Sequence, residues 1–69
     1  MKKRMFEFVN DKSCKFWEVW TEDFSLFTRY GKIGVAGQIT EKNYSSKDEA
    51  NLEADKIIKQ KLKKGYVEV

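Results

Sequence analysis

The sequence predicts an α+β fold in which an antiparallel β-sheet of four to five strands carries one C-terminal helix packed on one face. Up to Asn43 the chain alternates apolar and polar side chains in short runs that are rich in aromatic and β-branched residues, as strands do. The linkers between these runs are too short for parallel crossovers. From Ser46 onwards the apolar residues instead recur with the helical period. Because the chain has no proline and no linker-like stretch, residues 1–69 are expected to form a single domain.

Four strands are expected, and the second is the clearest of them. Its Phe16 and Trp20 alternate with Trp17 and Val19, so the two tryptophans point to opposite faces. We therefore expect one tryptophan in the core and the other on the face that a single helix leaves open. In the fourth strand Ile39 is the residue expected to point inward. The expected strands are Met5–Val9, Lys15–Thr21, Phe24–Lys32 and Gln38–Asn43.

The helix is expected at Lys47–Lys64. Ser46 and Glu49 have the spacing of a capping box, and Gly65 suits the position just after the last helical turn. Lys61 interrupts the apolar stripe of this helix, and its aliphatic stem is expected to snorkel. Residues 66–69 are expected to add a short last strand or to fold back on the core. The stripe consists of Ala50, Ala54, Ile57, Ile58 and Lys61, with Leu62 at its margin.

The composition limits the chemistry that the chain can perform. A net charge of +3 and a pI of about 9.0 permit a nucleic acid or an acidic protein as partner but require neither. One cysteine and no histidine exclude an intramolecular disulfide and the usual zinc site, so no metal and no cofactor are expected. Cys14 is expected to be an ordinary buried or half-buried thiol. Without a histidine base or an activated nucleophile, the chain is predicted not to be an enzyme. It contains no signal-peptide core and no membrane span, which predicts a cytoplasmic protein with no membrane partner.

A glycine turn follows the third strand. Gly31, Gly34 and Gly37 recur at a spacing of three, which is typical of turns that need positive φ or close backbone approach. Residues 31–34 also fit the GxxG loop of a KH domain, but that loop lies between helices, whereas the flanks here are predicted strands. Tyr30 and Lys32 should share one face of the third strand and Arg29 the other, unless Gly31 bends the strand. The turn therefore offers an aromatic ring and cations to an anionic partner.

The motifs in their order resemble the WGR domain. They are KFWEV at 15–19, RYGKIG at 29–34 and GQ at 37–38, followed by a helix that ends KLKKGY at 61–66. FEFV at 6–9 and GYVE at 65–68 are similar to the bacterial branch of that family, in which the domain begins longer proteins grouped as molybdate metabolism regulators. The resemblance implies an antiparallel sheet with a helix packed across it. It also implies that Trp17 and Val19 are the inward pair of the second strand.

In the DNA-dependent poly(ADP-ribose) polymerases the WGR domain binds broken DNA ends through the Trp and Arg of its namesake motif. Carried over to this chain, the resemblance places Tyr30 at the Trp position and Lys32 at the Arg position, and leaves Gly31 unchanged. Tyrosine still stacks on a sugar or base with less area. Lysine still neutralises a phosphate but lacks the planar fork of arginine. Lys42 is the closest substitute for a basic residue that often follows the glycine turn.

Two functions follow from these observations. The first is a non-catalytic module that binds DNA with exposed ends or breaks. The second is a module that binds another domain or protein through the open sheet face and Trp20. The predicted nucleic-acid-binding residues are Arg29, Tyr30, Gly31, Lys32, Gln38 and Lys42.

Overall fold

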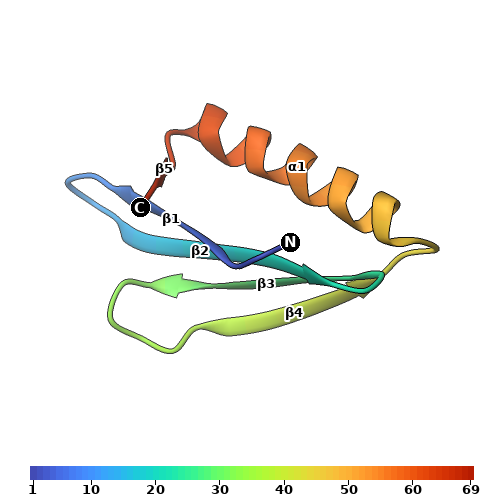
Figure 1. Ribbon diagram of the computed structural model, residues 1–69. Helices are drawn as coiled ribbons and strands as arrows, with labels where there is room; N and C mark the ends of the chain where they lie inside the picture. Colours follow the sequence, from blue (N-terminus) through green and yellow to red (C-terminus); the bar gives the residue numbers. More distant parts are fainter.

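The computed structural model describes residues 1–69 as a five-stranded antiparallel sheet with one helix across one face (Figure 1). The strand order is β4-β3-β2-β1-β5. The short C-terminal strand β5 forms one edge of the sheet and pairs with the N-terminal strand β1. The α+β fold predicted from the sequence is confirmed. The elements are β1 (Arg4–Val9), β2 (Cys14–Glu22), β3 (Ser25–Lys32), β4 (Gln38–Asn43), α1 (Lys47–Lys64) and β5 (Val67–Glu68).

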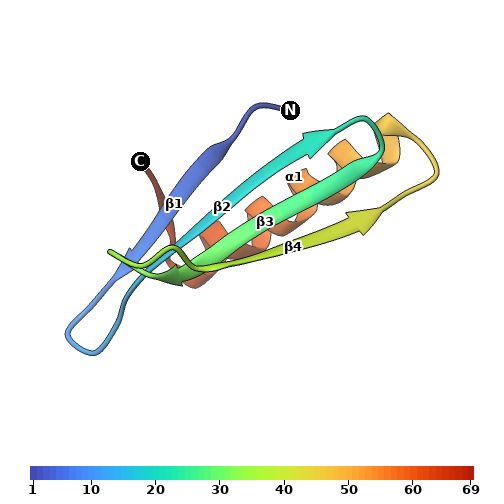
Figure 2. The ribbon, with the colours of Figure 1, turned by 90° about the horizontal axis from the view of Figure 1, so that it is seen from below.

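β2 is the centre of the sheet and pairs along its length with β1 and β3. The turn from β2 to β3 contains two residues, and Asp23 takes the left-handed conformation there with φ of 53°. The helix packs on β2 and β3. When the molecule is seen from below, the helix lies behind these two strands (Figure 2). α1 is the single helix, and it lacks the apolar length that crossing a bilayer requires.

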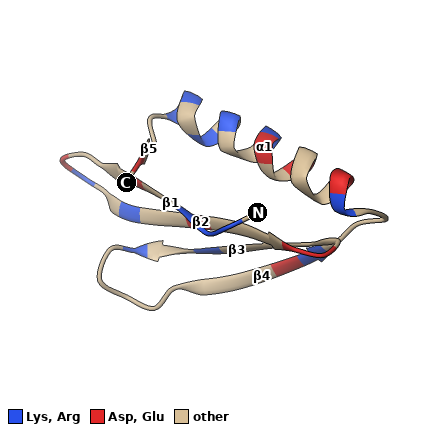
Figure 3. Cartoon of the chain, in the orientation of Figure 1, with Lys and Arg blue, Asp and Glu red and all other residues tan.

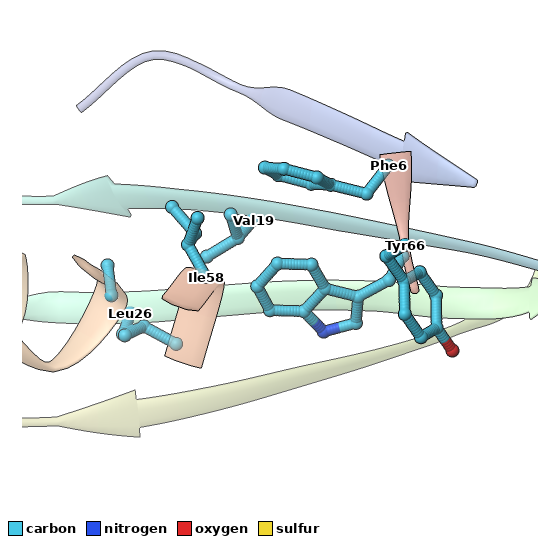
Figure 4. Close-up of a cluster of buried hydrophobic side chains, with 7 residues drawn as sticks. Phe6, Val19, Leu26, Ile58 and Tyr66 are labelled. Atoms are coloured by element: carbon cyan, nitrogen blue, oxygen red, sulfur yellow. The ribbon is translucent and has the colours of Figure 1, made fainter. Parts of the chain in front are cut away.

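The core lies between α1 and the sheet. Trp17 and Val19 point toward the helix from β2, as the family resemblance implied, and they meet Phe6 of β1 and Ile58 of α1. The Phe6 and Trp17 rings are 5.5 Å apart between centroids. Tyr66, which follows the helix, closes the cluster at one end, and Figure 4 shows its ring beside the core side chains. Aromatic area of this size compensates for the shortness of the chain.

The helix has the bounds that the sequence predicted, and Ser46 and Gly65 cap it, but the Glu49 carboxylate accepts from the Ser45 hydroxyl and does not complete the capping box. The Ser46 side chain accepts a hydrogen bond from the Glu49 backbone N–H at 3.1 Å. Gly65 takes φ of 106° and donates its backbone N–H to the Leu62 carbonyl. Ala50, Ala54 and Ile58 are the buried residues of its apolar stripe. Lys61 is half-buried at the end of that stripe.

Two expectations about burial were wrong. Ile39 is 63% exposed, because β4 is the edge strand and Ile39 pairs with Arg29 on the face that α1 does not cover. Cys14 is exposed, because it opens β2 opposite Val9 at the end of the β1–β2 hairpin, on that same face. The inward assignment of Ile39 was wrong, and Cys14 lies one residue before the strand that was expected to begin at Lys15; in both cases the position of the residue within the sheet decides its burial.

The face without the helix is covered in part by its own side chains. Trp20 is only 9% exposed, since it stacks on Phe27 with centroids 5.4 Å apart and lies beneath Lys3. At the other end of β2 the loop at 33–37 folds over Phe16, and Figure 2 shows this loop crossing toward β1. Trp20 does lie on the face that the helix leaves open, as expected for one of the two tryptophans, but the side chains around it bury its ring and it is not an open surface.

Candidate functional site

A groove lies on the helix-covered face of the sheet, where α1 ends, β2 begins and β3 ends. Its volume is about 450 Å³. Lysines and aromatic rings dominate its nine lining residues, and none of the nine carries a carboxylate. We call this site the basic groove. It is lined by Lys15, Lys32, Lys61, Trp17, Tyr30 and Tyr66, together with Phe16, Thr28 and Gly31.

The register of β2 and β3 positions the sheet residues of the basic groove. Trp17 pairs with Tyr30, and Lys15 pairs with Lys32. Side chains directly opposite one another on adjacent strands share a face, with their Cβ atoms about 5 Å apart. Tyr30 is 41% exposed, and its hydroxyl donates to Oε1 of Gln38 at 3.2 Å. The Tyr30 ring is therefore held at the rim, where a ligand can reach it.

Lys61 enters the basic groove from the last turns of α1. Its Nζ lies 5.0 Å from the centroid of the Tyr66 ring and 5.4 Å from that of Trp17. Partial burial, followed by the like charges of Lys64 and Lys15, lowers the pKa of Lys61 below the ordinary lysine value. The two rings favour the ammonium, but no carboxylate forms an ion pair with it. Lys61 is therefore a cation that lacks an anionic partner within the domain.

The glycines let the turn close tightly behind the basic groove. Gly31 lies against the backbone of Gly37, and a Cβ on Gly31 would be 3.0 Å from the Gly37 Cα. Gly37 has φ of 81°, and a Cβ there would lie 2.5 Å from the Tyr30 carbonyl oxygen. Both close approach and positive φ are thus required at this turn, as the spacing of the glycines predicted.

Arg29 lies on the opposite face of the sheet, as the alternation along β3 predicted. Its Nε donates to Oε1 of the buried Glu18 at 2.9 Å, and its Nη1 donates to the Ala36 carbonyl at 2.6 Å. The guanidinium also lies 4.6 Å from the centroid of the Phe16 ring. These contacts tie the 33–37 loop to β2. Arg29 is therefore separated from the basic groove by the sheet.

The structure brings together only part of the predicted binding set. Tyr30, Gly31 and Lys32 line the basic groove, and Gln38 lies beside it through its contact with Tyr30. Lys42 is on the same face but four residues farther along β4, about 13 Å away from Gln38 at the usual rise of a strand. There its Nζ lies 5.7 Å from the Tyr44 ring centroid.

Sequence reasoning missed the residues that complete the basic groove. Lys15, Trp17, Lys61 and Tyr66 come from β2, from α1 and from the segment after α1, and only the packing of the helix brings them together. One signal was present in the sequence, because Lys61 occupied an apolar position of the helical stripe. Alternation also placed Lys15 on the face of Trp17.

Charge is distributed unevenly along the molecule. Figure 3 shows lysine and arginine on the last turns of α1 and on the ends of β2 and β3 below them. Aspartate and glutamate cluster at the other end, on the first turn of α1 and at the turn between β2 and β3, although Asp11 in the β1–β2 turn and Glu68 in β5 lie at the basic end. A modest net charge of +3 therefore conceals an excess of lysine around the last turns of α1.

Comparison with known proteins gives consistent matches over nearly the whole chain. A family model described as the WGR domain matches residues 2–69. In Escherichia coli K12, the chain is 43% identical over 68 residues to "Uncharacterized protein YfeS" and 38% identical over 65 residues to "Protein YehF". These matches cover 99% and 94% of this chain.

A crystal structure of a Bacteroides fragilis protein, determined by the Northeast Structural Genomics Consortium, matches the fold with a TM-score of 0.97. The sequence identity is 46%, and the match covers 99% of this chain and 19% of that one. The chain likewise spans 28% and 24% of the two curated relatives. All three similar proteins are thus several times longer than this chain.

Proposed function

The chain belongs to the WGR domain family, a family of nucleic-acid-binding modules, and from this premise we propose that it binds DNA at exposed ends or breaks through the basic groove. The observation that carries the proposal is the lining of the groove, which combines lysines with aromatic rings and contains no carboxylate. Phosphates are neutralised by lysine, and sugars or bases stack on aromatic rings. The lysines and the aromatic rings line one groove of about 450 Å³.

Some lining residues would contact the DNA, and others form the floor of the groove. Lys15 and Lys32 reach the groove from adjacent strands and would neutralise a phosphate, while Tyr30 offers its exposed ring to the terminal sugar or base. Trp17 and Tyr66 are no more than 9% exposed. They form the floor of the groove and hold the Lys61 ammonium above it.

Two residues predicted from the sequence have other roles in this proposal. The guanidinium of Arg29 is occupied by Glu18 and Ala36 on the far face, so Arg29 supports the turn. Lys42 lies outside the basic groove and supplies only general attraction to a polyanion. A protein partner on the face without the helix has less support, because Trp20 is shielded by Phe27 and Lys3.

Substitutions in the basic groove test the proposal. The affinity for a 5′-phosphorylated DNA duplex is measured by fluorescence anisotropy across a range of salt concentrations. Lys32→Ala should weaken binding and reduce the slope of log affinity against log salt by about 0.9, the value for one phosphate contact on duplex DNA. Tyr30→Ala should cost about 1–3 kcal/mol of binding free energy through lost stacking.

Lys42→Ala is the matched control, since it removes the same charge from the same face outside the groove. It should change the affinity much less than Lys32→Ala. Unchanged affinity in both groove variants, or equal losses in Lys32→Ala and Lys42→Ala, would rule out the groove as the binding site.

A further inference from the structure

A second basic pocket adjoins the basic groove at the β1–β2 hairpin. Its volume is about 330 Å³, and it contains three lysines and no carboxylate. Lys15 and Lys32 line both this pocket and the basic groove, so the two cavities share a wall. We call it the hairpin pocket, and its lining consists of Lys12, Ser13, Cys14, Lys15 and Lys32.

The shared wall is a pair of like charges. Lys15 and Lys32 are directly opposite each other in the β2–β3 register. Like charges at such positions destabilise a sheet. The ion pairs of the domain are Arg4–Glu68 and Arg29–Glu18, so neither lysine is neutralised by a carboxylate. An anion bound on either side of this wall would relieve the repulsion.

Lys12, the third lysine of the hairpin pocket, lies in a turn whose backbone is held by Asn10. The Asn10 side chain accepts the backbone N–H groups of Lys12 at 2.9 Å and of Ser13 at 2.7 Å. The Asn10 N–H donates in turn to the Ser13 carbonyl at 2.8 Å. Asp11, the carboxylate of this turn, does not line the pocket. Hydrogen bonds within the turn therefore hold the backbone that carries Lys12.

We propose that the basic groove and the hairpin pocket are consecutive phosphate subsites for one DNA strand, with Lys15 and Lys32 between them and Lys12 at the outer subsite. This inference rests on the proposed function and extends it. A terminal nucleotide occupies the basic groove, and the next phosphate of the same strand lies in the hairpin pocket. The ligand is thus an oligonucleotide strand, and a lone nucleotide fills only half of the site.

The order of the subsites follows from their linings. Aromatic rings are confined to the basic groove, whereas the hairpin pocket offers lysine ammonium groups, a hydroxyl and a thiol. A base or sugar therefore gains stacking only in the basic groove. The hairpin pocket provides for a phosphate alone.

The test compares ligands of two lengths on the intact domain. The probes are thymidine 5′-monophosphate and a 5′-phosphorylated oligothymidylate of about four nucleotides, the lower limit of common single-strand site sizes. Lys12→Gln should leave the mononucleotide affinity unchanged. It should lower the affinity for the oligonucleotide about fivefold near 0.1 M salt. It should also reduce the slope of log affinity against log salt by about 0.7, the value for one phosphate on a single strand. Lys59→Gln, a change at an exposed helix lysine outside both pockets, is the control and should leave both affinities unchanged.

The outcomes separate this inference from the proposed function. If wild type binds neither probe at low salt but binds the 5′-phosphorylated duplex, the two-subsite inference fails while the groove proposal stands. If wild type binds neither the probes nor the duplex, both fail. If it binds both probes and Lys12→Gln affects neither, or affects both equally, the two-subsite inference fails while the groove proposal stands.

Cys14 offers a second readout, because it is the single cysteine, is exposed and lines the hairpin pocket. The oligonucleotide should slow its alkylation by iodoacetamide severalfold at saturation, and the mononucleotide should not. Equal alkylation rates with and without bound oligonucleotide would overturn the inference.

Discussion

Lys61 occupies a position in α1 where the helical period favours an apolar residue. Its ammonium lies over the rings of Trp17 and Tyr66 and lines the basic groove. An apolar side chain would fill the same space without the unfavourable proximity of Lys15 and Lys64, which contributes to its lowered pKa. Packing alone therefore does not explain a lysine here, whereas the proposed anionic ligand would.

Lys61→Met should separate the two roles of this residue. Methionine keeps an unbranched apolar stem, so the free energy of unfolding should change by no more than about 0.5 kcal/mol after allowance for solvent screening. The affinity for DNA should fall about fivefold near 0.1 M salt. Urea unfolding and anisotropy measure the two quantities, and an unchanged affinity would reduce Lys61 to a structural residue.

The same lysine predicts a pH dependence of binding. Because its pKa in the free domain is lowered, Lys61 loses its proton at a lower pH than an ordinary lysine does. The ligand favours the protonated form, so the affinity of wild type should begin to decline with rising pH before free lysines titrate. Lys61→Met should lack this early decline, which titrations at several alkaline pH values would detect. Parallel pH profiles for wild type and Lys61→Met would contradict the assignment.

Gly37 predicts an effect on stability. Alanine there meets both a positive φ and the Tyr30 carbonyl oxygen, which would lie 2.5 Å from the new Cβ. Gly34→Ala is the matched control, since φ is 99° there but no atom lies within 4 Å of the position. Gly34→Ala should cost about 1 kcal/mol of unfolding free energy, and Gly37→Ala should cost at least about 2 kcal/mol. Equal losses in urea unfolding would show that the close approach at Gly37 is unimportant.

β5 depends on one ion pair and a few backbone contacts. Arg4 donates from Nε and Nη2 to the two carboxylate oxygens of Glu68, at 2.8 and 2.7 Å. The Val69 N–H donates to the Met5 carbonyl at 3.0 Å. This strand follows Tyr66 directly, so its pairing with β1 helps to hold the Tyr66 ring against the core and the basic groove.

The ion pair of β5 predicts how stability changes in acid. Hydrogen bonds from Arg4 lower the pKa of Glu68 in the folded domain. The stabilisation is therefore present above the glutamate pKa of the unfolded chain, about 4.3, and is lost as pH falls through the lower folded value. Wild type should lose more stability than Glu68→Gln between neutral pH and this acidic range. Urea midpoints at a series of pH values measure the difference.

Glu41→Gln is the control for that series, because Glu41 is an exposed glutamate of an edge strand with no ion pair. Its acid profile should match that of wild type. If Glu68→Gln also follows the wild-type profile, the ion pair contributes nothing to stability.

At the scale of the whole molecule, local signals in the sequence predicted the fold well. The bounds of α1 follow from Ser46 and Gly65, whose capping roles depend on neighbours within a few residues. Strand alternation assigned the faces of β2 and β3 correctly. It could not predict the exposure of Ile39, because alternation does not tell which strand lies at the edge.

The candidate site was predictable only in part, for a physical reason. Tyr30, Gly31 and Lys32 are contiguous, so one motif in the sequence indicates all three. Lys15 and Lys61 are brought to them by strand register and helix packing, which are tertiary properties. Arg29 shows the converse, since its neighbour Tyr30 lines the groove while its own side chain binds Glu18 on the other face.

The most direct test of the central claim is an NMR titration of the isotope-labelled domain with a DNA duplex that has a 5′-phosphorylated open end. A duplex closed by hairpin loops at both ends is the control, and both are titrated at low and then physiological salt. The account predicts shifts that are confined to Lys12–Lys15, Tyr30–Lys32 and the segment 61–66, that are stronger for the open end and that fade with salt. No shifts at low salt, or shifts centred on Trp20 and Phe27, would contradict it.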